Sequence, residues 1–310
     1  MAGKSKVTVV GAGNIGGTVA LHLALRNYTD VVLVDIVEGL PQGKALDILE
    51  SGPIERFDAS VIGTNNYEDT EGSDIAVITS GKPRQPGMDR SELLNDNQEI
   101  VSSVTEQLVE HSPECIIIVV ANPLDAMCHV VIETSGFPRE RVVGMAGILD
   151  TARYRTFIAQ ELGASVRDVF ALVLGGHGDT MVPLPSMATV SGVPITQMLS
   201  QEQVDEIVQR TRQGGAEIVD LLGSGSAFYA PAAAIVEMID AILLDQKRIL
   251  PCAAYLQGEY GINDLFVGVP VKLGAGGVEE VIELDLTDEE REDLEHSADD
   301  VRNMVEVLHS

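Results

Sequence analysis

A glycine-rich turn between an apolar strand and a helix constrains the fold of this 310-residue chain more than any other feature. The strand pattern Val7–Val10 runs directly into Gly11-Ala-Gly13-Asn-Ile-Gly16, and a helical pattern starts at once. In this setting the first glycine permits a tight turn, the second admits a pyrophosphate, and the third lets the helix pack on the strand. The helix N-terminus adds unpaired N–H groups and a partial positive charge. The turn therefore predicts a dinucleotide site.

An acidic residue at the end of the next apolar run specifies the kind of dinucleotide. Asp35 closes the run VVLVD and lies about 20 residues beyond Gly16, the separation at which an acid binds the adenosine ribose. Its charge would repel a 2′-phosphate, so Asp35 favours NAD. The alternative, in which the glycines serve only as a turn, does not explain why strand, helix and acid occur together.

The order of apolar patterns predicts an α/β fold with two domains. The first half alternates helical patterns with strands that are apolar on both faces, which is typical of a parallel sheet covered by helices on both sides. The pattern changes after Gly147 and predicts a mixed α+β second half. It has helical stretches at about 151–162, 201–222 and 227–245, and strand-like runs at 169–178, 180–185, 250–261 and 265–277. No Pro-, Gly- or Ser-rich linker separates the halves, so we expect tightly packed domains at 1–146 and 147–310.

Composition argues against several classes of function. The chain has 48 acidic and 20 basic residues and a net charge of -28, which disfavours binding to nucleic acid or to an anionic membrane. No apolar run reaches the ~18 residues of a membrane-spanning helix, and the N-terminal sequence lacks the features of a signal peptide. Cys115, Cys128 and Cys252 form no CxxC pair and fit reduced, buried thiols. We expect a cytoplasmic protein.

Part of the acidic excess is concentrated near the C-terminus. Residues 283–300 hold ten acids and one base. Such a run is typical of a solvated helix face. A second interpretation is that the whole surface is suited to concentrated salt, which screens the repulsion between carboxylates.

Four further segments, with the glycine motif, resemble the lactate/malate dehydrogenase family. They are KPRQPGMDR (82–90), VANPLD (120–125), GILDTARYR (147–155) and GGHGDTMVP (175–183), in the family's order and spacing across the chain. The resemblance implies a Rossmann-type doubly wound parallel sheet, a C-terminal substrate domain, and NAD as cofactor. It is strongest for the malate dehydrogenases that are most like lactate dehydrogenases. This implies malate and oxaloacetate as the substrate pair, a place in the tricarboxylic acid cycle, and a homo-tetramer in preference to a dimer.

Hydride transfer from a secondary alcohol requires a base for the hydroxyl proton, and histidine is the usual one. His177 is flanked by glycines at 175, 176 and 178, which leave its ring unobstructed. The resemblance makes His177 the acid/base residue and Asp150 its orienting carboxylate. Asp150 is also well placed to be a helix N-cap, and both roles can hold together. The remaining histidines are expected to be ordinary, partly exposed residues: His22, His111, His129, His296 and His309.

Arginines are the predicted ligands of the substrate's carboxylates. Arg153 lies three residues after Asp150, and the resemblance makes it the clamp for the carboxylate next to the reacting carbon. Arg84 and Arg90 lie in a Pro- and Gly-containing segment typical of a closing lid, although solvation alone is the simpler interpretation. The resemblance implies that Arg90 polarises the carbonyl and that Arg84 pairs with the second carboxylate of oxaloacetate. Lactate dehydrogenases carry an uncharged Gln at that position.

Asn122 resembles the residue that places the substrate hydroxyl and the nicotinamide. The Asn122-Pro123 bond is a candidate for the cis form. The resemblance implies further cofactor contacts at Asn14, Ile15, Asn97, Val120 and Asn122. The small residues of 225–231 are expected to line the substrate pocket.

Three other functions remain as alternatives. A lactate or other 2-hydroxy-acid dehydrogenase would leave the charge of Arg84 unpaired. A related family of NAD-using glycosidases needs a metal, and the sequence shows no credible ligand set. A catalytically silent NAD-binding module would not require every acid/base and anion-binding position to be filled.

Overall fold

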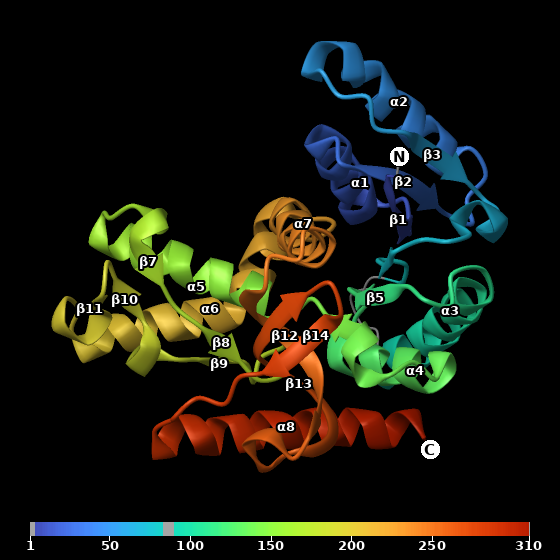
Figure 1. The fold of residues 1–310 in the computed structure, drawn as a ribbon. Coiled ribbons are helices and arrows are strands. Elements are labelled where there is room, and N and C mark those ends of the chain that lie inside the picture. The colour runs from blue at the N-terminus through green and yellow to red at the C-terminus, as the bar shows by residue number, and fades with distance from the viewer. Residues whose placement is uncertain (1–3, 83–89, 310) are drawn as a thin grey trace.

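The computed structural model describes residues 4–82 and 90–309, which are built around one nine-stranded sheet (Figure 1). Six of its strands are parallel, in the spatial order 3-2-1-4-5-6 of a doubly wound dinucleotide-binding sheet. They are β3 (Val61–Thr64), β2 (Thr29–Val34), β1 (Ser5–Val10), β4 (Ile75–Ile78), β5 (Ile116–Val119) and β6 (Val142–Gly144). The α/β prediction is confirmed.

The second half of the chain extends this same sheet. Strand β12 (Arg248–Gln257) pairs antiparallel with β6, and β13 (Asn263–Gly274) and β14 (Gly277–Val281) follow it outward. Two small antiparallel sheets complete the mixed α+β half. Their strands are β7 (Val169–Phe170), β8 (Val173–Leu174), β9 (Val182–Pro183), β10 (Thr189–Val190) and β11 (Val193–Pro194).

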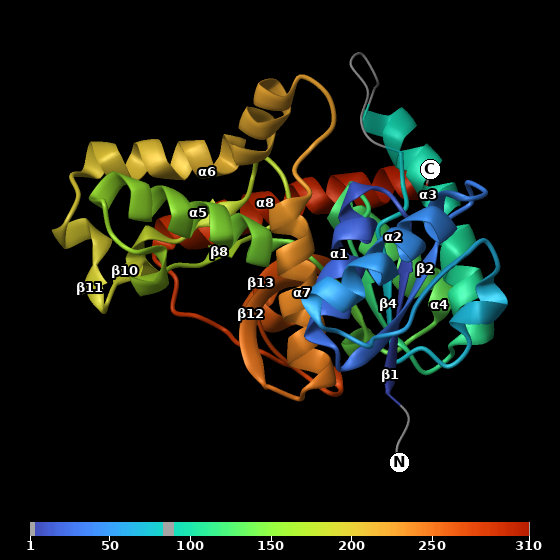
Figure 2. The same cartoon turned by 90° about the horizontal axis from the view of Figure 1, so that it is seen from above.

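Apolar side chains of the parallel strands point alternately to the two faces of the sheet, so a core forms on each face. Val7 and Val9 join one apolar cluster, whereas Val10 joins another, because successive side chains of a strand point to opposite faces. The first face is covered by α1 (Asn14–Arg26), α2 (Leu40–Glu55) and α7 (Tyr229–Leu243), and the second by α3 (Arg90–His111) and α4 (Leu124–Ser135) (Figure 2). The last helix, α8 (Asp288–Leu308), packs against α3, α4 and β13.

A third apolar cluster lies between α5 (Gly147–Leu162) and α6 (Gln201–Leu222). Helix α6 has the predicted bounds, but α5 begins earlier than the predicted start at Thr151. The cause is burial, because Ile148 and Leu149 both pack into the core and continue the helix toward its N-terminus. Asp150 therefore lies inside the first turn, and the N-cap position belongs to Ala146. The N-cap interpretation of Asp150 was wrong.

Two predictions from composition can be compared with the described part of the chain. Cys115, Cys128 and Cys252 are buried and form no disulfide, as predicted. Over residues 4–82 and 90–309, no helix has both the length and the apolar character needed to cross a membrane.

Candidate active site

The glycine turn after β1 is shaped by close contacts on one side and by open space on the other. Gly11 has a φ of +103°, and a Cβ there would lie 2.6 Å from Oγ1 of Thr79. A Cβ on Gly16 would lie 1.9 Å from the carbonyl oxygen of Gly11. A Cβ on Gly13, by contrast, would meet no described atom within 4 Å. The turn thus requires Gly11 and Gly16 for packing and keeps Gly13 open where a pyrophosphate would approach.

Asp35, at the end of β2, lies against this turn. Its Oδ2 accepts a hydrogen bond from the backbone N–H of Ala12 at 2.7 Å, and its Oδ1 accepts one from Val37 at 2.9 Å. Sequence reasoning missed Lys44 of α2, whose ammonium donates to the carbonyl oxygen of Gly13 at 2.8 Å. The predicted ribose-binding acid and the glycine turn therefore form one site at the carboxyl ends of β1 and β2.

His177, Asp150 and Arg153 form a connected group. Nδ1 of His177 lies 2.8 Å from Oδ2 of Asp150, and Oδ1 of that carboxylate accepts from Nη1 of Arg153 at 2.9 Å. The side chains are 15%, 2% and 13% exposed, in the order His177, Asp150, Arg153. The carboxylate is thus shielded from water, while the imidazole and the guanidinium still reach the surface.

The guanidinium of Arg153 rests against a glycine pair in α6 that sequence reasoning missed. A Cβ on Gly214 would come within 3.1 Å of Cδ of Arg153, and a Cβ on Gly215 within 3.6 Å of its Nη2. Nε of Arg153 is buried and has no hydrogen-bond partner among the described residues. The arginine side chain therefore packs closely on Gly214, where an added Cβ would be tight, and lies at ordinary contact distance from Gly215.

The surroundings of His177 favour its protonated form. Burial acts most strongly and disfavours the imidazolium, but the charge and hydrogen bond of Asp150 outweigh it, with a further contribution from Asp125. Arg153 acts in the opposite direction, and the resulting pKa of His177 is raised above its ordinary value. A histidine held in this way can both accept and donate a proton.

The backbone that carries His177 is held by residues from distant parts of the chain. Gly175, with a φ of +83°, exchanges hydrogen bonds of 2.9 and 3.0 Å with Gly268 of β13. The N–H of Gly176 donates to Oγ of Ser297 in α8 at 2.9 Å, and that of His177 donates to Oδ2 of Asp125 in α4 at 2.8 Å. Asp125 belongs to the VANPLD segment, but sequence reasoning gave it no role, and it missed Ser297.

Asn122 lies just beyond β5, and its bond to Pro123 is cis, as predicted. Its side chain is exposed, and its backbone carbonyl accepts from Nδ2 of Asn97 at 2.6 Å. Oδ1 of Asn97 accepts from the N–H of Lys82 at 2.7 Å. Asn97 is fully buried, so its side chain ties the segment after β4 to the segment after β5.

The other predicted site residues differ in how far the structure describes them. Asn14 is exposed and Ile15 half-buried at the start of α1, whereas Val120 is buried at the end of β5. Arg84 lies outside the described residues. Arg90 begins α3, and its side chain is not among those that the structure describes.

One of the histidines expected to be partly exposed is buried instead. His129 of α4 is 4% exposed, and its Nε2 accepts a hydrogen bond from the backbone N–H of Phe266 in β13 at 3.2 Å. Helix α4 packs directly on β13, which the sequence pattern does not reveal. Burial, with a smaller effect of His309, lowers the pKa of His129 to about 4.

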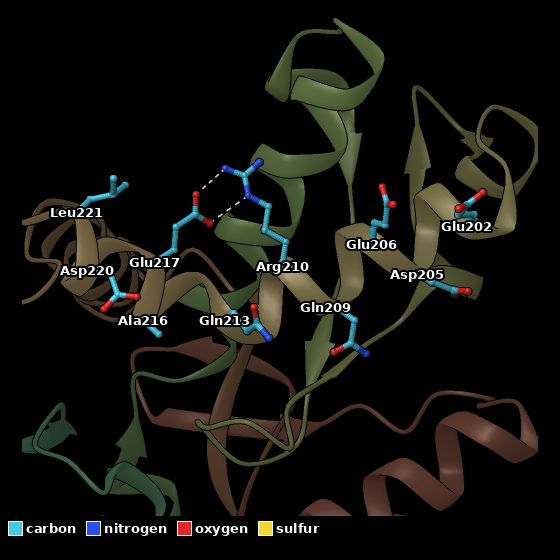
Figure 3. Close-up of a pocket in the computed structure, with 10 residues that line it drawn as sticks. All are labelled: Glu202, Asp205, Glu206, Gln209, Arg210, Gln213, Ala216, Glu217, Asp220 and Leu221. Carbon is cyan, nitrogen blue, oxygen red and sulfur yellow. Dashed lines mark hydrogen bonds and ion pairs between the residues drawn. The ribbon is translucent and has the colours of Figure 1, made fainter. Parts of the chain in front are cut away.

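A surface hollow of about 980 Å³ along α6 is separate from this group (Figure 3). In it Arg210 points toward Glu217, and the two side chains make hydrogen bonds of 2.9 and 3.0 Å. Its lining is strongly acidic and would repel an anionic substrate or a diphosphate. The lining residues are Glu202, Asp205, Glu206, Gln209, Arg210, Gln213, Ala216, Glu217, Asp220 and Leu221.

Two family models together match nearly the whole chain. The NAD binding domain of lactate/malate dehydrogenase matches residues 5–144, and the alpha/beta C-terminal domain of lactate/malate dehydrogenase matches residues 148–309. The chain belongs to the lactate/malate dehydrogenase family.

Individual members of this family resemble the chain over its full length. A malate dehydrogenase of Thermomicrobium roseum is 61% identical over 98% of this chain and 98% of its own. The solved malate dehydrogenase of Salinibacter ruber has a TM-score of 0.94 at 59% identity, covering 98% of this chain and 97% of that one. The solved lactate dehydrogenase of Cryptosporidium parvum, in complex with lactic acid and NAD, has a TM-score of 0.97 at 45% identity, covering 100% and 99%.

As a member of the lactate/malate dehydrogenase family, the chain is an oxidoreductase with NAD as its cofactor. The residues present fit that cofactor. Gly13 leaves open space at the N-terminus of α1, where a diphosphate binds in such folds. The carboxylate of Asp35 lies against the same turn, where it accepts the N–H of Ala12.

Proposed function

We propose that this chain is a malate dehydrogenase that interconverts (S)-malate and oxaloacetate with NAD. The observation that carries the proposal is the 54–61% full-length identity to eight malate dehydrogenases, of which the Thermomicrobium roseum protein is one. The two cationic positions Arg84 and Arg90 add support from the sequence, because a dicarboxylate offers two anionic groups.

In this proposal His177 accepts the proton of the malate hydroxyl. Its Nδ1 faces the carboxylate of Asp150, so the ring proton lies there and Nε2 is left with a lone pair. Bound NAD supplies the acceptor for the hydride from the carbinol carbon. Once His177 is protonated, the buried charge of Asp150 stabilises the imidazolium. In the reverse direction the imidazolium returns its proton to the developing alkoxide.

Three arginines and one asparagine are proposed to hold the substrate. Arg153 uses one N–H group for Asp150. Its other N–H groups bind the carboxylate next to the reacting carbon. Asn122, exposed at the end of β5, orients the hydroxyl. Arg90 polarises the carbonyl, and Arg84 pairs with the distal carboxylate, both assigned by resemblance of the sequence.

The direct test follows the oxidation of NADH with oxaloacetate and, separately, with pyruvate. We expect kcat/KM to favour oxaloacetate by orders of magnitude. A preference for pyruvate would replace the proposal with a lactate dehydrogenase, the second candidate, which the resemblance to the Cryptosporidium parvum enzyme keeps open.

The acid/base role is tested by His177→Asn. We expect this variant to bind NADH like the parent, because other residues form the cofactor site, and to lose about 100-fold to 10,000-fold in turnover. NADH binding is followed by fluorescence titration and turnover by absorbance. Activity within a few-fold of the parent would remove His177 from the mechanism.

We also propose a homo-oligomer, with a tetramer favoured over a dimer, and a cytoplasmic location. Large apolar side chains are exposed on α2 and at the end of α6, which supports burial between copies. They are Leu46, Leu49, Ile54, Leu221 and Leu222. Light scattering with size-exclusion chromatography gives the mass directly.

A domain boundary at 146/147 is supported by the break between the two matched segments.

A further inference from the structure

Two buried carboxylates, not one, contact His177. Asp150 binds the imidazole ring, and Asp125 of α4 accepts the backbone N–H of His177 through Oδ2 at 2.8 Å. Asp125 is 2% exposed, and its Oδ1 has no hydrogen-bond partner in the part of the chain that the structure describes. The proposed mechanism so far uses only Asp150.

The single hydrogen bond to the His177 backbone does not by itself require a carboxylate at position 125. The oxygen of an amide side chain could accept the same N–H, whereas burying an ionised carboxylate without a paired cation is unfavourable. Asp125 lies in the first turn of α4, where the helix dipole favours an anion. That effect is modest, so the buried charge calls for a partner of opposite sign.

Among the described residues, the groups around Asp125 leave one nearby source of such a charge. Cys128 lies on the same helix, and the carboxylate of Asp150 in α5 has the same sign as that of Asp125. From α8, the uncharged Ser297 faces the neighbouring Gly176. Arg153 is hydrogen-bonded to Oδ1 of Asp150. In this part of the chain, the cation that can form next to Asp125 is therefore the imidazolium of His177.

We propose that Asp125 is a positioning residue for the acid/base step, which fixes the backbone of His177 and stabilises its imidazolium together with Asp150. The proposal rests on the function proposed for His177. It also brings a residue of the first half of the chain to the acid/base pair itself, because Asp125 precedes residue 146 and Asp150 follows it.

The carboxylate of Asp125 is ionised at neutral pH. Burial raises the pKa of Asp125 to about 6, while the N–H and the charge of His177 act to lower it. Above that pH the carboxylate is ionised and the two groups titrate as a coupled pair.

The test uses Asp125→Asn, which keeps an acceptor oxygen for the His177 N–H and removes the charge. Ser297→Ala is the matched control, because Ser297 holds the adjoining N–H of Gly176 at 2.9 Å and carries no charge. The pKa of His177 is measured by NMR in the full chain with ¹³C-labelled histidine, and the pH profile of kcat/KM for malate oxidation is measured in parallel. Melting temperatures confirm that each variant is folded.

We expect Asp125→Asn to lower the pKa of His177 by about one unit and to move the rising limb of malate oxidation to lower pH by the same amount. Ser297→Ala should leave the pKa within a few tenths of a unit. An unchanged pKa in a folded Asp125→Asn variant would overturn the proposal.

Should Asp125→Asn not fold, the parent alone decides the question. The His177 signal should then show a second inflection near pH 6, where Asp125 ionises, and a single inflection would overturn the proposal. The NMR readout needs no activity. A His177→Asn variant that remained active would therefore reject the proposed function without affecting the result on Asp125.

Discussion

Substrate choice is expected to depend on the single side chain of Arg84. Oxaloacetate and pyruvate share the keto-acid end assigned to Arg153, Arg90 and His177, and they differ by the carboxylate assigned to Arg84. Removing one member of a desolvated charge pair costs ~2 to 5 kcal/mol, or roughly 30-fold to several thousand-fold. Arg84→Gln should lower kcat/KM for oxaloacetate by about that factor and leave pyruvate reduction unchanged or improved.

Arg84→Lys is the matched control, since it keeps the charge and loses only the planar fork. Steady-state kinetics with both substrates on the parent and the two variants gives the ratio. If the oxaloacetate-to-pyruvate ratio is the same in the parent and in Arg84→Gln, Arg84 does not select the dicarboxylate.

Cofactor choice is likewise expected to depend on one side chain, Asp35. We expect the parent to prefer NADH strongly over NADPH, and Asp35→Ser to lose that preference, because the carboxylate repels a 2′-phosphate. Asp35 also accepts the N–H groups of Ala12 and Val37, one on each oxygen, so Asp35→Asn is the comparison that removes the charge and retains one acceptor oxygen. KM values for both cofactors measure the effect, and a parent that uses both equally well contradicts it.

Residue patterns predicted the groups that carry the proposed chemistry better than those that support them. His177 stood out because glycines surround it, and its role and those of Asp150 and Arg153 were assigned by resemblance to the family's motifs. Asp125 and Ser297 were not identifiable as its supports, because their contacts with the His177 loop depend on how α4 and α8 pack against it. No local spacing encodes that packing.

At the scale of elements, helix ends were predictable where a local signal marks them. Ser200 and Gln203 form a capping box at the start of α6, and α6 has the predicted bounds. The start of α5 has no such signal, because it depends on burial of Ile148 and Leu149. The extension of the parallel sheet by β12 to β14 likewise depends on pairing between residues far apart in sequence, such as Ala253 with Gly144.

His129, in the contact between α4 and β13, is expected to make the fold less stable in acid. His129 is neutral in the folded state, with a pKa of about 4 against an ordinary value of 6.5. The lowered pKa contributes stability above pH 6.5, and this contribution is lost as the pH falls toward 4. Between pH 7 and pH 5 the loss is about 2 kcal/mol.

The variant His129→Gln, which keeps an acceptor for the N–H of Phe266, should lack this loss. Urea unfolding of parent and variant at pH 7 and pH 5, at one protein concentration, measures it. The free energy of unfolding of the parent, minus that of His129→Gln, should be about 2 kcal/mol smaller at pH 5 than at pH 7. Asp125 titrates in both proteins and does not contribute to the difference. An advantage independent of pH would mean that His129 is not a buried neutral histidine.

At the scale of the whole molecule, acidic side chains are exposed on two helices of the second half of the sequence, α6 and α8. Glu289, Glu292 and Glu295 are exposed on α8, and five of the ten residues that line the hollow along α6 are acids. With a net charge of -28, these carboxylates repel one another at low ionic strength. The repulsion is larger in the compact state than in the expanded unfolded chain, and it therefore lowers the free energy of unfolding.

Salt should relieve this repulsion and raise the melting temperature. The Debye length falls from about 10 Å at 0.1 M to about 3 Å at 1 M, so added salt screens the repulsion between carboxylates over progressively shorter distances. We expect the melting temperature to rise from near-zero to molar sodium chloride, and most steeply at the low end. Glu292→Gln/Glu295→Gln should be more stable than the parent at low salt and should gain less from added salt, because two of the repelling charges are gone. Sucrose is the uncharged control, since it stabilises by exclusion from the surface and should act equally on parent and variant. A melting temperature that stays flat or falls with salt would mean that the acidic surface is only a solvated one.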